Sequence, residues 1–403
     1  MLPLAKNSVL VLPGGRFQVP LIQKARALGY WTVCADRDGN CAGSLEADEF
    51  HSIGLNEEKQ LLELARTIQP VGIVTDQTDA GVKVVARLAE NLKLPGIGTR
   101  CAQLYTDKSL MREFGRSHGF ATPDFRLCLD LGSAQSAARE LSFPLVLKPI
   151  DNQSSKGVHR VNNAEELAAR WPDAWRHTTG ETVLLEQFVD GVEFTAEGFM
   201  GANRHRTLGI SEKRHYRECP MVACSLQYTP ANNRFDYEEL RCAHDAWVEE
   251  SGLPFGMTHA EYKFARGRYY MIEVAARGGG TRIASDIVPW ISGVDSQEWL
   301  LASACGNAPD PTNFNLAGRC ALLEFFHFPP GRILSIKGVE KTRRMPGVRE
   351  VIFGYEVGDS LPSVTNDTTR QGHFILLTDT ESELLALREQ VLHAVRVETE
   401  SCR

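Results

Sequence analysis

The chain has 403 residues, too many for one ordinary domain and enough for two or three domains with separate apolar cores. Hydrophobic residues make up 43% and charged residues 24%, and no apolar run is long enough to span a membrane. The formal net charge of -7 argues against general nucleic-acid affinity, because proteins that bind the phosphate backbone usually present a basic surface. We therefore expect a globular cytoplasmic protein that binds neither membranes nor nucleic acids.

The first hundred residues alternate short apolar strands with helical segments, a rhythm typical of a parallel sheet wound with helices. The expected elements are strands over 8–12, 31–35 and 72–75 and a helix over 19–28. Ligands of such sheets bind at the carboxyl ends of the strands, where Asp79 falls. Gly14-Gly15 lacks the further glycines of a dinucleotide fingerprint, which disfavours a nicotinamide-dependent oxidoreductase. The two glycines fit a tight turn and a backbone cradle for an anion equally well.

Later segments also carry clear patterns. We expect a helix over 101–118, an apolar strand over 143–147 that delivers Lys148 to its exit, and an amphipathic helix over 381–397. The cysteines lack CxxC pairs and metal-ligand spacing, which indicates reduced thiols.

The segment 259–277 predicts two strands around a glycine-containing turn. A three-residue loop over 266–268 would set Glu261 directly opposite Glu273, with His259 on the same face as Glu261. Facing carboxylates destabilise a sheet unless a cation lies between them, and Mg²⁺ takes such oxygen ligands together with substrate phosphates. The alternative is a different register with two solvated glutamates.

Two further segments have the character of a nucleotide site. Lys148 leaves its strand into a small polar loop, whose backbone amides can close over phosphates while the lysine neutralises charge. A flexible surface turn has a similar composition. The segment 184–193 combines apolar residues with acceptors that can hold a purine and its ribose.

In their order and separations these segments resemble the ATP-grasp superfamily, and the whole chain is similar to its three-domain ligases, from amino-acid ligases to purine-pathway enzymes and biotin carboxylase. The resemblance implies an α/β and α+β multidomain fold. Its parts would be an N-terminal Rossmann-like parallel α/β domain over 1–103, an ATP-grasp domain over 104–302 with a lid over about 119–188, and a small C-terminal α+β domain over 303–403. The resemblance also implies a homodimer.

The resemblance further implies which residues form the site. Those expected to bind ATP are Lys108, Lys148, Ser154, Ser155, Gly157, Glu186, Phe188, Val189 and Glu193. Those expected to hold Mg²⁺, or Mn²⁺ in its place, are Glu261 and Glu273. Those expected near the substrates are Arg277, Gly279, Lys213, Arg214 and Asp79.

Each group has an implied role. Lys148 is expected to act in catalysis on the ATP phosphates together with Arg277, which faces the reacting carboxylate and stabilises developing charge. The loop that contains Ser154 is expected to close as a lid. The linker 186–189 would meet adenine through its backbone, and Glu193 would bind the ribose hydroxyls.

Three features leave alternatives open. Ala275 stands where many members carry the asparagine of Glu-x-Asn, so the number of magnesium ions is undecided. The basic segment 211–220, between expected strands, is either a solvated face or a loop that draws in the carboxylate through Lys213 and Arg214. His259 is either a substrate contact or a packed strand histidine.

Together these features predict an ATP- and Mg²⁺-dependent ligase for small-molecule substrates. It would activate a carboxylate as an acyl phosphate and join it to an amine, with an amino acid as one substrate, to give an amide or peptide bond. An ATP-grasp carboxylase or purine-pathway ligase is the alternative within enzymes. A catalytically silent nucleotide-binding regulator is the alternative from another class, and Ala275 is its best support.

Overall fold

The chain begins with a four-stranded parallel sheet in the order β3-β2-β1-β4. The computed structural model describes residues 7–151, 156–178 and 180–400. The elements of this first unit are β1 (Ser8–Val11), α1 (Val19–Ala27), β2 (Trp31–Asp36), α2 (Ala42–Glu46), β3 (Glu49–Ser52), α3 (Glu58–Ile68), β4 (Gly72–Val74) and α4 (Asp79–Leu92). The predicted parallel α/β unit is confirmed, since β1 pairs in parallel with β2 and β4 and apolar residues of the strands are buried under the helices.

The helix expected over 101–118 is two helices, α5 (Gly98–Leu104) and α6 (Lys108–Ser117). The break is at Asp107, whose carboxylate accepts hydrogen bonds from the backbone N–H groups of Ser109 and Leu110 and so caps a new helix. The apolar pattern runs through both helices, which is why the prediction merged them. The cap makes Lys108 the first residue of a helix.

A second, antiparallel sheet of four strands follows in the order β5-β8-β6-β7. Its elements are β5 (Phe125–Cys128), α7 (Leu131–Leu141), β6 (Leu145–Pro149), β7 (His159–Val161), α8 (Ala164–Arg176) and β8 (Val183–Gln187). Alanines and leucines of α7 and α8 pack on one face of this sheet in a core of their own. We call this unit the lid sheet. The predicted strand over 143–147 is confirmed with a shift of two residues, and it carries Lys148.

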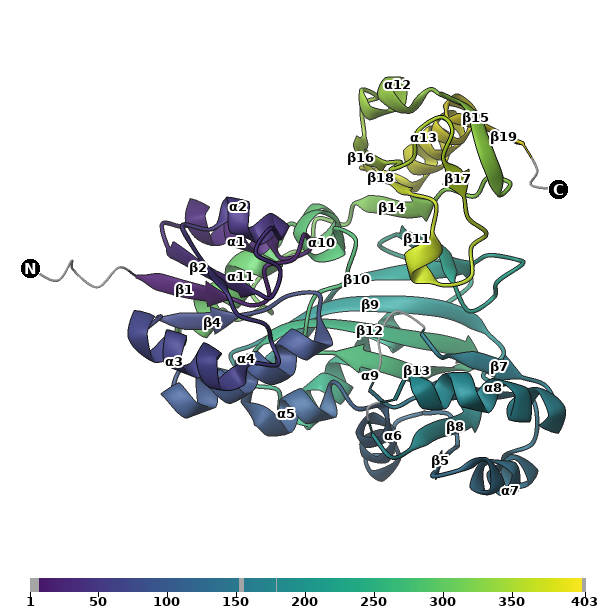
Figure 1. The fold of residues 1–403 in the computed structure, drawn as a ribbon, viewed down its shortest axis with the longest axis horizontal. Coiled ribbons are helices and arrows are strands. Elements are labelled where there is room, and N and C mark those ends of the chain that lie inside the picture. Colours follow the sequence, from purple (N-terminus) through teal and green to yellow (C-terminus); the bar gives the residue numbers. More distant parts are fainter. Residues whose placement is uncertain (1–6, 152–155, 179, 401–403) are drawn as a thin grey trace, which may run out of the picture.

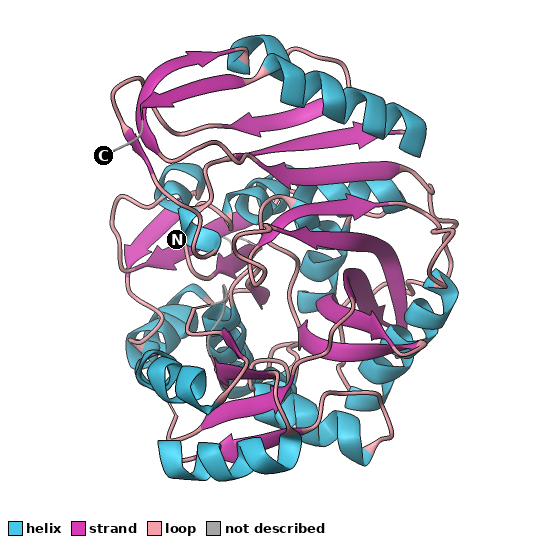
Figure 2. Ribbon diagram, turned by 90° about the vertical axis from the view of Figure 1, so that its right-hand side faces the viewer, coloured by secondary structure: helices cyan, strands magenta, loops and turns pink. Residues whose placement is uncertain are grey.

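The largest sheet has eight antiparallel strands in the order β13-β12-β9-β10-β11-β14-β18-β16. The strands are β9 (Val192–Gly201), β10 (Arg204–His215), β11 (Ala223–Tyr228), β12 (Gly256–Ala265), β13 (Arg268–Ala275), β14 (Cys320–Phe325), β16 (Val348–Ile352) and β18 (His373–Thr378). Helices α9 (Tyr237–Ser251), η1 (Ile283–Ile287), α10 (Val288–Ser292) and α11 (Ser296–Ala304) accompany it. Figure 2 shows strands of the C-terminal third continuing the layer of this central sheet.

The last hundred residues add a small three-stranded sheet above that layer (Figure 1). Its elements are β15 (Gly331–Lys337), α12 (Val339–Arg343), β17 (Ser360–Leu361), η2 (Asp367–Thr369), α13 (Glu381–Ala394) and β19 (Arg396–Glu400). The helix predicted to reach residue 397 ends at Ala394, because Val395 turns into extended backbone and β19 pairs with β15.

The structure confirms the predicted mixed α/β and α+β fold. The central sheet runs across residue 303, so the proposed domain limits remain predictions. Within the described residues, no helix is both long enough and apolar enough to cross a bilayer.

Candidate active site

Strands β12 and β13 form a hairpin whose turn differs from the prediction. Two residues, Arg266 and Gly267, make the turn, and both have a positive φ (52° and 76°), as in a type I′ turn. A β-bulge between Glu261 and Tyr262 then adds the residue that the shorter turn lacks. Glu261 is therefore directly opposite Glu273, as predicted, and the alternative register is wrong.

Each facing carboxylate is paired with a lysine from another element. Lys213 Nζ lies 2.5 Å from Glu261 Oε1, and Lys108 Nζ lies 2.8 Å from Glu273 Oε1. Burial would raise the pKa of Glu261, but the Lys213 ammonium holds that pKa below its usual value. The pair thus presents carboxylate oxygens of the kind Mg²⁺ prefers, and the donor set fits that ion. No cluster of three or more His, Cys, Asp or Glu side chains suited to a metal occurs in the described ranges.

Lys148 belongs to a buried charge triad that the sequence analysis missed. Its Nζ lies 2.6 Å from Glu186 Oε1, and Arg112 Nε donates to Glu186 Oε2 at 2.9 Å. Arg112 is four residues after Lys108 on α6, and this spacing, which puts both cations on one helix face, was the available signal. Burial, together with the nearby Arg112 and Lys108 cations, lowers the pKa of Lys148 to about 8. An anion bound beside this lysine would stabilise its charged form.

The connection between the lid sheet and β9 supplies the apolar wall of the cavity. Two cations contact the Phe188 ring, with the Arg160 guanidinium carbon and Lys263 Nζ at 4.3 and 4.7 Å from its centroid. Glu193 Oε1 lies 2.7 Å from Lys213 Nζ, so this lysine bridges two carboxylates.

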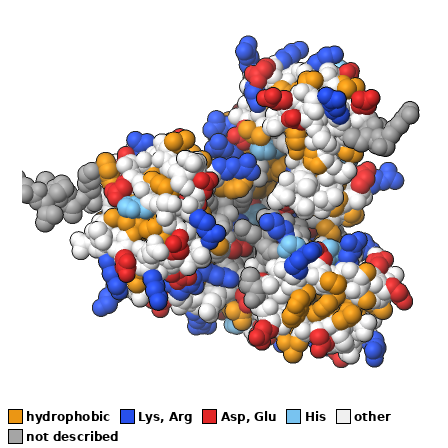
Figure 3. All heavy atoms as spheres, in the orientation of Figure 1, with side chains coloured by type: hydrophobic (Ala, Val, Ile, Leu, Met, Phe, Trp, Pro, Cys, Tyr) orange, Lys and Arg blue, Asp and Glu red, His pale blue; other side chains and the backbone are white. Residues whose placement is uncertain are grey.

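This cavity brings together lysines, carboxylates and apolar side chains from both sheets. Its lining residues are Lys108, Val146, Lys148, Val158, Glu186, Gln187, Phe188, Val189, Glu193, Lys213, His215, Pro220, Met221, Glu261, Lys263, Ile272 and Glu273. Figure 3 shows this side of the molecule hollowed between the N-terminal, lid and C-terminal parts, with basic side chains along the rim.

Arg277 and the glycine run lie at the junction with the N-terminal sheet. Arg277 Nε donates to Asp79 Oδ1 at 2.6 Å, and the next backbone N–H, of Gly278, donates to Asp76 Oδ1 at 3.0 Å. Asp76 is fully buried, and burial raises its pKa. A Cβ on Gly279 would lie 2.8 Å from the Ile283 side chain, so a larger residue would displace that neighbour. The N-terminal sheet therefore fixes both Arg277 and the backbone that follows it.

His259 combines features of the two roles that the sequence left open, a substrate contact and a packed strand histidine. Its Nδ1 is 2.8 Å from Oε1 of the buried Glu197, which also accepts from Tyr228 Oη at 3.0 Å. The hydrogen bond to Glu197 fixes the His259 ring, which is on the same sheet face as Glu261. Ala275 pairs directly with His259, so no side-chain oxygen stands at that position.

The remaining predicted residues fall in different places. Ser154 and Ser155 lie outside the described residues. Gly157 has φ 72°, and a Cβ there would meet His177 and Pro149. Residues 211–215 of the predicted basic loop belong to β10, and strand alternation points Lys213 into the cavity and Arg214 out of it, where 56% of its side chain is exposed.

Gly14 does not present a free anion cradle. Its N–H donates to Asp36 Oδ2 at 3.0 Å, and its carbonyl accepts from Gly43 N–H. The tight-turn interpretation of Gly14-Gly15 accounts for these contacts.

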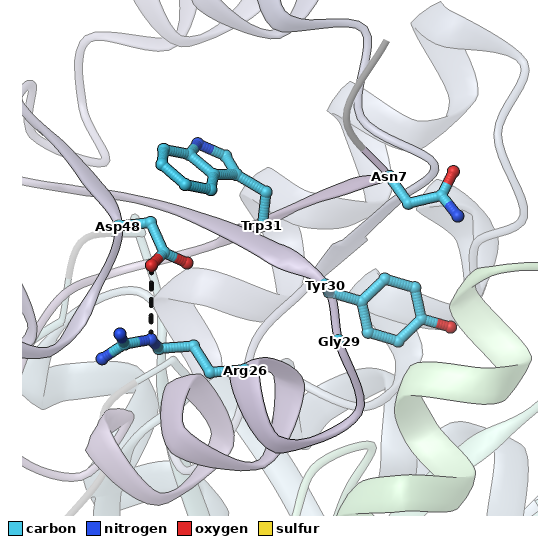
Figure 4. Close-up of a pocket in the computed structure, with 6 residues that line it drawn as sticks. All are labelled: Asn7, Arg26, Gly29, Tyr30, Trp31 and Asp48. Atoms are coloured by element: carbon cyan, nitrogen blue, oxygen red, sulfur yellow. Dashed lines mark ion pairs between the residues drawn. The ribbon is translucent and has the colours of Figure 1, made fainter. Parts of the chain in front are cut away.

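A separate hollow at the amino ends of strands β1, β2 and β3 lacks the chemistry of the cavity. Figure 4 shows its lining, in which Arg26 Nε lies 3.4 Å from Asp48 Oδ1. The hollow contains neither facing carboxylates nor a lysine among its described lining residues. The cavity between the lid sheet and the central sheet is therefore the candidate site.

Two family models match the chain. The ATP-grasp domain matches residues 141–286, and the L-amino acid ligase C-terminal domain 2 matches residues 324–400. A D-alanine–D-alanine ligase from Pseudomonas putida is 37% identical over 233 residues, which cover 53% of this chain and 69% of the ligase. The chain belongs to the ATP-grasp superfamily. The predicted family is confirmed, and the matched ATP-grasp region contains the β12–β13 hairpin and most of the lid sheet.

Other relatives share parts of this ATP-grasp chain or its fold. A formate-dependent phosphoribosylglycinamide formyltransferase from Prochlorococcus marinus is 25% identical over 194 residues, 47% of this chain and 50% of that enzyme. The chain thus spans about half the length of this curated relative. An L-amino acid ligase from Bacillus licheniformis has the same fold, with a TM-score of 0.80, 21% identity, and coverage of 98% of this chain and 100% of that one.

Proposed function

We propose that this ATP-grasp protein is an ATP- and Mg²⁺-dependent ligase that activates a carboxylate as an acyl phosphate and joins it to an amine. An amino acid is one substrate, and an amide or peptide bond is the product. The observation that carries the proposal is the pairing of Glu261 opposite Glu273 on the wall of a cavity that also contains Lys108 and Lys148. The matches to amino-acid ligases support the choice of substrate class.

Different residues of the cavity bind different parts of the nucleotide. Lys108 and Lys148 bind the phosphates of ATP, because both are buried cations that line the cavity and a charge-assisted hydrogen bond to phosphate is strong where water is scarce. The backbone of the linker 186–189 contacts the adenine, and Phe188 and Val189 of this linker line the cavity. Glu193 binds the ribose hydroxyls, and Lys213 holds that carboxylate ionised. Glu261 and Glu273 would hold magnesium, which would supply positive charge against the phosphates.

The reaction needs little covalent chemistry from the protein. Arg277 orients the substrate carboxylate, one oxygen of which attacks the γ-phosphorus of ATP in line while ADP leaves. The guanidinium and the two lysines offset negative charge in the transition state. The amine then attacks the carbonyl carbon of the acyl phosphate, phosphate leaves, and the nitrogen loses a proton to give the amide.

A hydroxylamine trapping assay tests this function. The protein should release ADP from ATP and Mg²⁺ only when one carboxylate of a panel of amino acids is present, and hydroxylamine should capture that carboxylate as a hydroxamate. Omission of the carboxylate is the matched control. ATP binding without turnover for any carboxylate and amine would favour the regulator and reject the ligase.

The pKa of Lys148 makes a separate prediction about pH. The ammonium is needed to bind the ATP phosphates and is present below a pKa of about 8. We therefore expect kcat/KM for ATP to fall as the pH rises through about 8, approaching tenfold per pH unit. In Lys148→Arg the fall should disappear, because arginine stays protonated over this range. An unchanged profile in that variant would assign the decline to another group.

A further inference from the structure

The face of the central sheet that carries the candidate site continues into the C-terminal strands. Residues paired across neighbouring strands share a face. Lys213 pairs with Leu226, and Leu226 pairs with Leu323 of β14. Phe325, two residues further along β14, is therefore on the same face as Lys213 and Glu261.

Arg370 lies on this face, directly after η2 and three residues before β18 begins. Its guanidinium carbon is 4.0 Å from the centroid of the Phe325 ring, and its Nη2 is 2.8 Å from Asp367 Oδ1. Its Nε is buried and has no hydrogen-bond partner among the described residues. Unpaired buried donors are rare in folded proteins, so an unpaired one beside a functional site indicates a missing acceptor.

The segment that carries Arg370 reaches the site from the C-terminal part. It descends between β17 and β18 onto the turn between β10 and β11 (Figure 1), where Cys219 Sγ is 3.6 Å from the carbonyl oxygen of Thr365. Burial lowers the pKa of Arg370, and the charges of the Asp367 and Glu261 carboxylates oppose that shift. The guanidinium is thus within electrostatic range of a proposed metal ligand.

A chain of contacts joins this position to the glycine run. The Phe325 ring also meets the His373 ring, with centroids 5.8 Å apart, and His373 Nε2 lies 3.1 Å from Glu350 Oε2. Glu350 Oε1 in turn lies 3.3 Å from Arg282 Nε, five residues after Arg277. Arg370 is therefore linked through Phe325, His373 and Glu350 to Arg282, a residue that follows the glycine run.

We propose that Arg370 binds the α-carboxylate of the amine substrate, which makes that substrate an amino acid or a peptide with a free carboxyl end. The inference rests on the proposed ligase function. Arg370 is not among the residues that line the nucleotide cavity, and Arg277 is assigned to the reacting carboxylate. A guanidinium presents a planar fork of N–H donors that matches a carboxylate, and the unpaired Nε is one of them.

The test compares two nucleophiles in the same enzyme. Hydroxylamine has no carboxylate, whereas an amino acid that serves as the amine substrate has one. The C-terminal amide of that amino acid differs from it only by the loss of the carboxylate charge. In Arg370→Met we expect kcat/KM for the amino acid to fall about 10- to 100-fold, as for loss of a hydrogen-bonded charge pair. Hydroxamate formation and use of the amide should change by less than about threefold on the same scale.

Arg332→Met is the matched control, because Arg332 is an exposed arginine of β15 in the same C-terminal part. Arg370→Lys keeps a cation over Phe325 but loses the fork, and it provides a second variant should Arg370→Met fold poorly. Its kcat/KM for the amino acid should lie between the values of the wild type and of Arg370→Met. Equal losses for acid, amide and hydroxylamine, or a rise in KM for ATP alone, would overturn the assignment.

A wild-type protein that forms no hydroxamate would reject the proposed function and not, by itself, the role of Arg370. Thermal stabilisation by each L-amino acid and by its amide then decides the matter. Stabilisation by the acid that is lost in Arg370→Met supports carboxylate binding, and identical shifts in both proteins overturn it.

Discussion

Glu273→Gln is expected to lower carboxylate-dependent ADP release about 100- to 1,000-fold, the cost of removing one group that stabilises transition-state charge. The substitution keeps the shape of the side chain but removes the charge that faces Glu261 across the hairpin. The Mg²⁺ concentration that gives half-maximal rate should also rise, because one of the two proposed carboxylate ligands is neutral. Steady-state rates over a magnesium titration measure both effects.

Glu212→Gln is the matched control for this variant. Glu212 is also a strand carboxylate with an ion pair, 2.7 Å from Arg234, but it is next to Lys213 in β10 and so lies on the opposite face of the sheet. Its loss should leave the rate and the magnesium dependence unchanged. A Glu273→Gln protein with the wild-type rate at the same magnesium concentration would remove the hairpin from the metal site.

Arg277→Ala is expected to lose about 100- to 1,000-fold in the carboxylate-dependent step while the affinity for ATP changes little. The reason is that Arg277 lies at the junction with the N-terminal sheet and does not line the nucleotide cavity. Single-turnover hydroxamate formation measures the first quantity, and calorimetric titration with ATP and Mg²⁺ measures the second.

Asp79→Asn separates chemistry from architecture in this experiment. Arg277 is ion-paired with Asp79 across the junction, so Arg277→Ala also removes a contact between the N-terminal and central parts. Asp79→Asn weakens that contact and keeps the guanidinium. If both variants lose the same activity, Arg277 acts by holding the junction; if Asp79→Asn retains most of the rate, the guanidinium itself serves the reacting carboxylate.

Local patterns predicted most elements near the site correctly. The alternation of apolar strands with helices in the first hundred residues indicated the parallel sheet, because both periodicities are short-range and depend on which face of each element is buried. The predicted pairing of Glu261 with Glu273 is correct, but the predicted three-residue turn is wrong. The two-residue turn with positive φ at Arg266 and Gly267 is compensated by a bulge, and both depend on backbone geometry that residue type alone does not fix.

Contacts between distant segments could not be obtained in this way. Glu186 was assigned to the adenine linker, yet its side chain lies between Lys148 and Arg112, residues that come from a strand and a helix far apart in sequence. Strand alternation also separated Lys213 from Arg214, because residues 211–215 belong to β10 and not to a loop. Whether a charge faces a cavity or solvent depends on which element it occupies.

The sequence by itself determined the family, the alternating layers of the N-terminal part, and the types of residue available for phosphate and metal binding, since these follow from local periodicity and from motif order. Only the tertiary structure decided which charges meet. Lys213 came to lie between Glu193 and Glu261, and Arg370 came to lie on Phe325 beside the same sheet face, because β-strands distant in sequence pair in one sheet and burial makes each charge depend on its nearest partner.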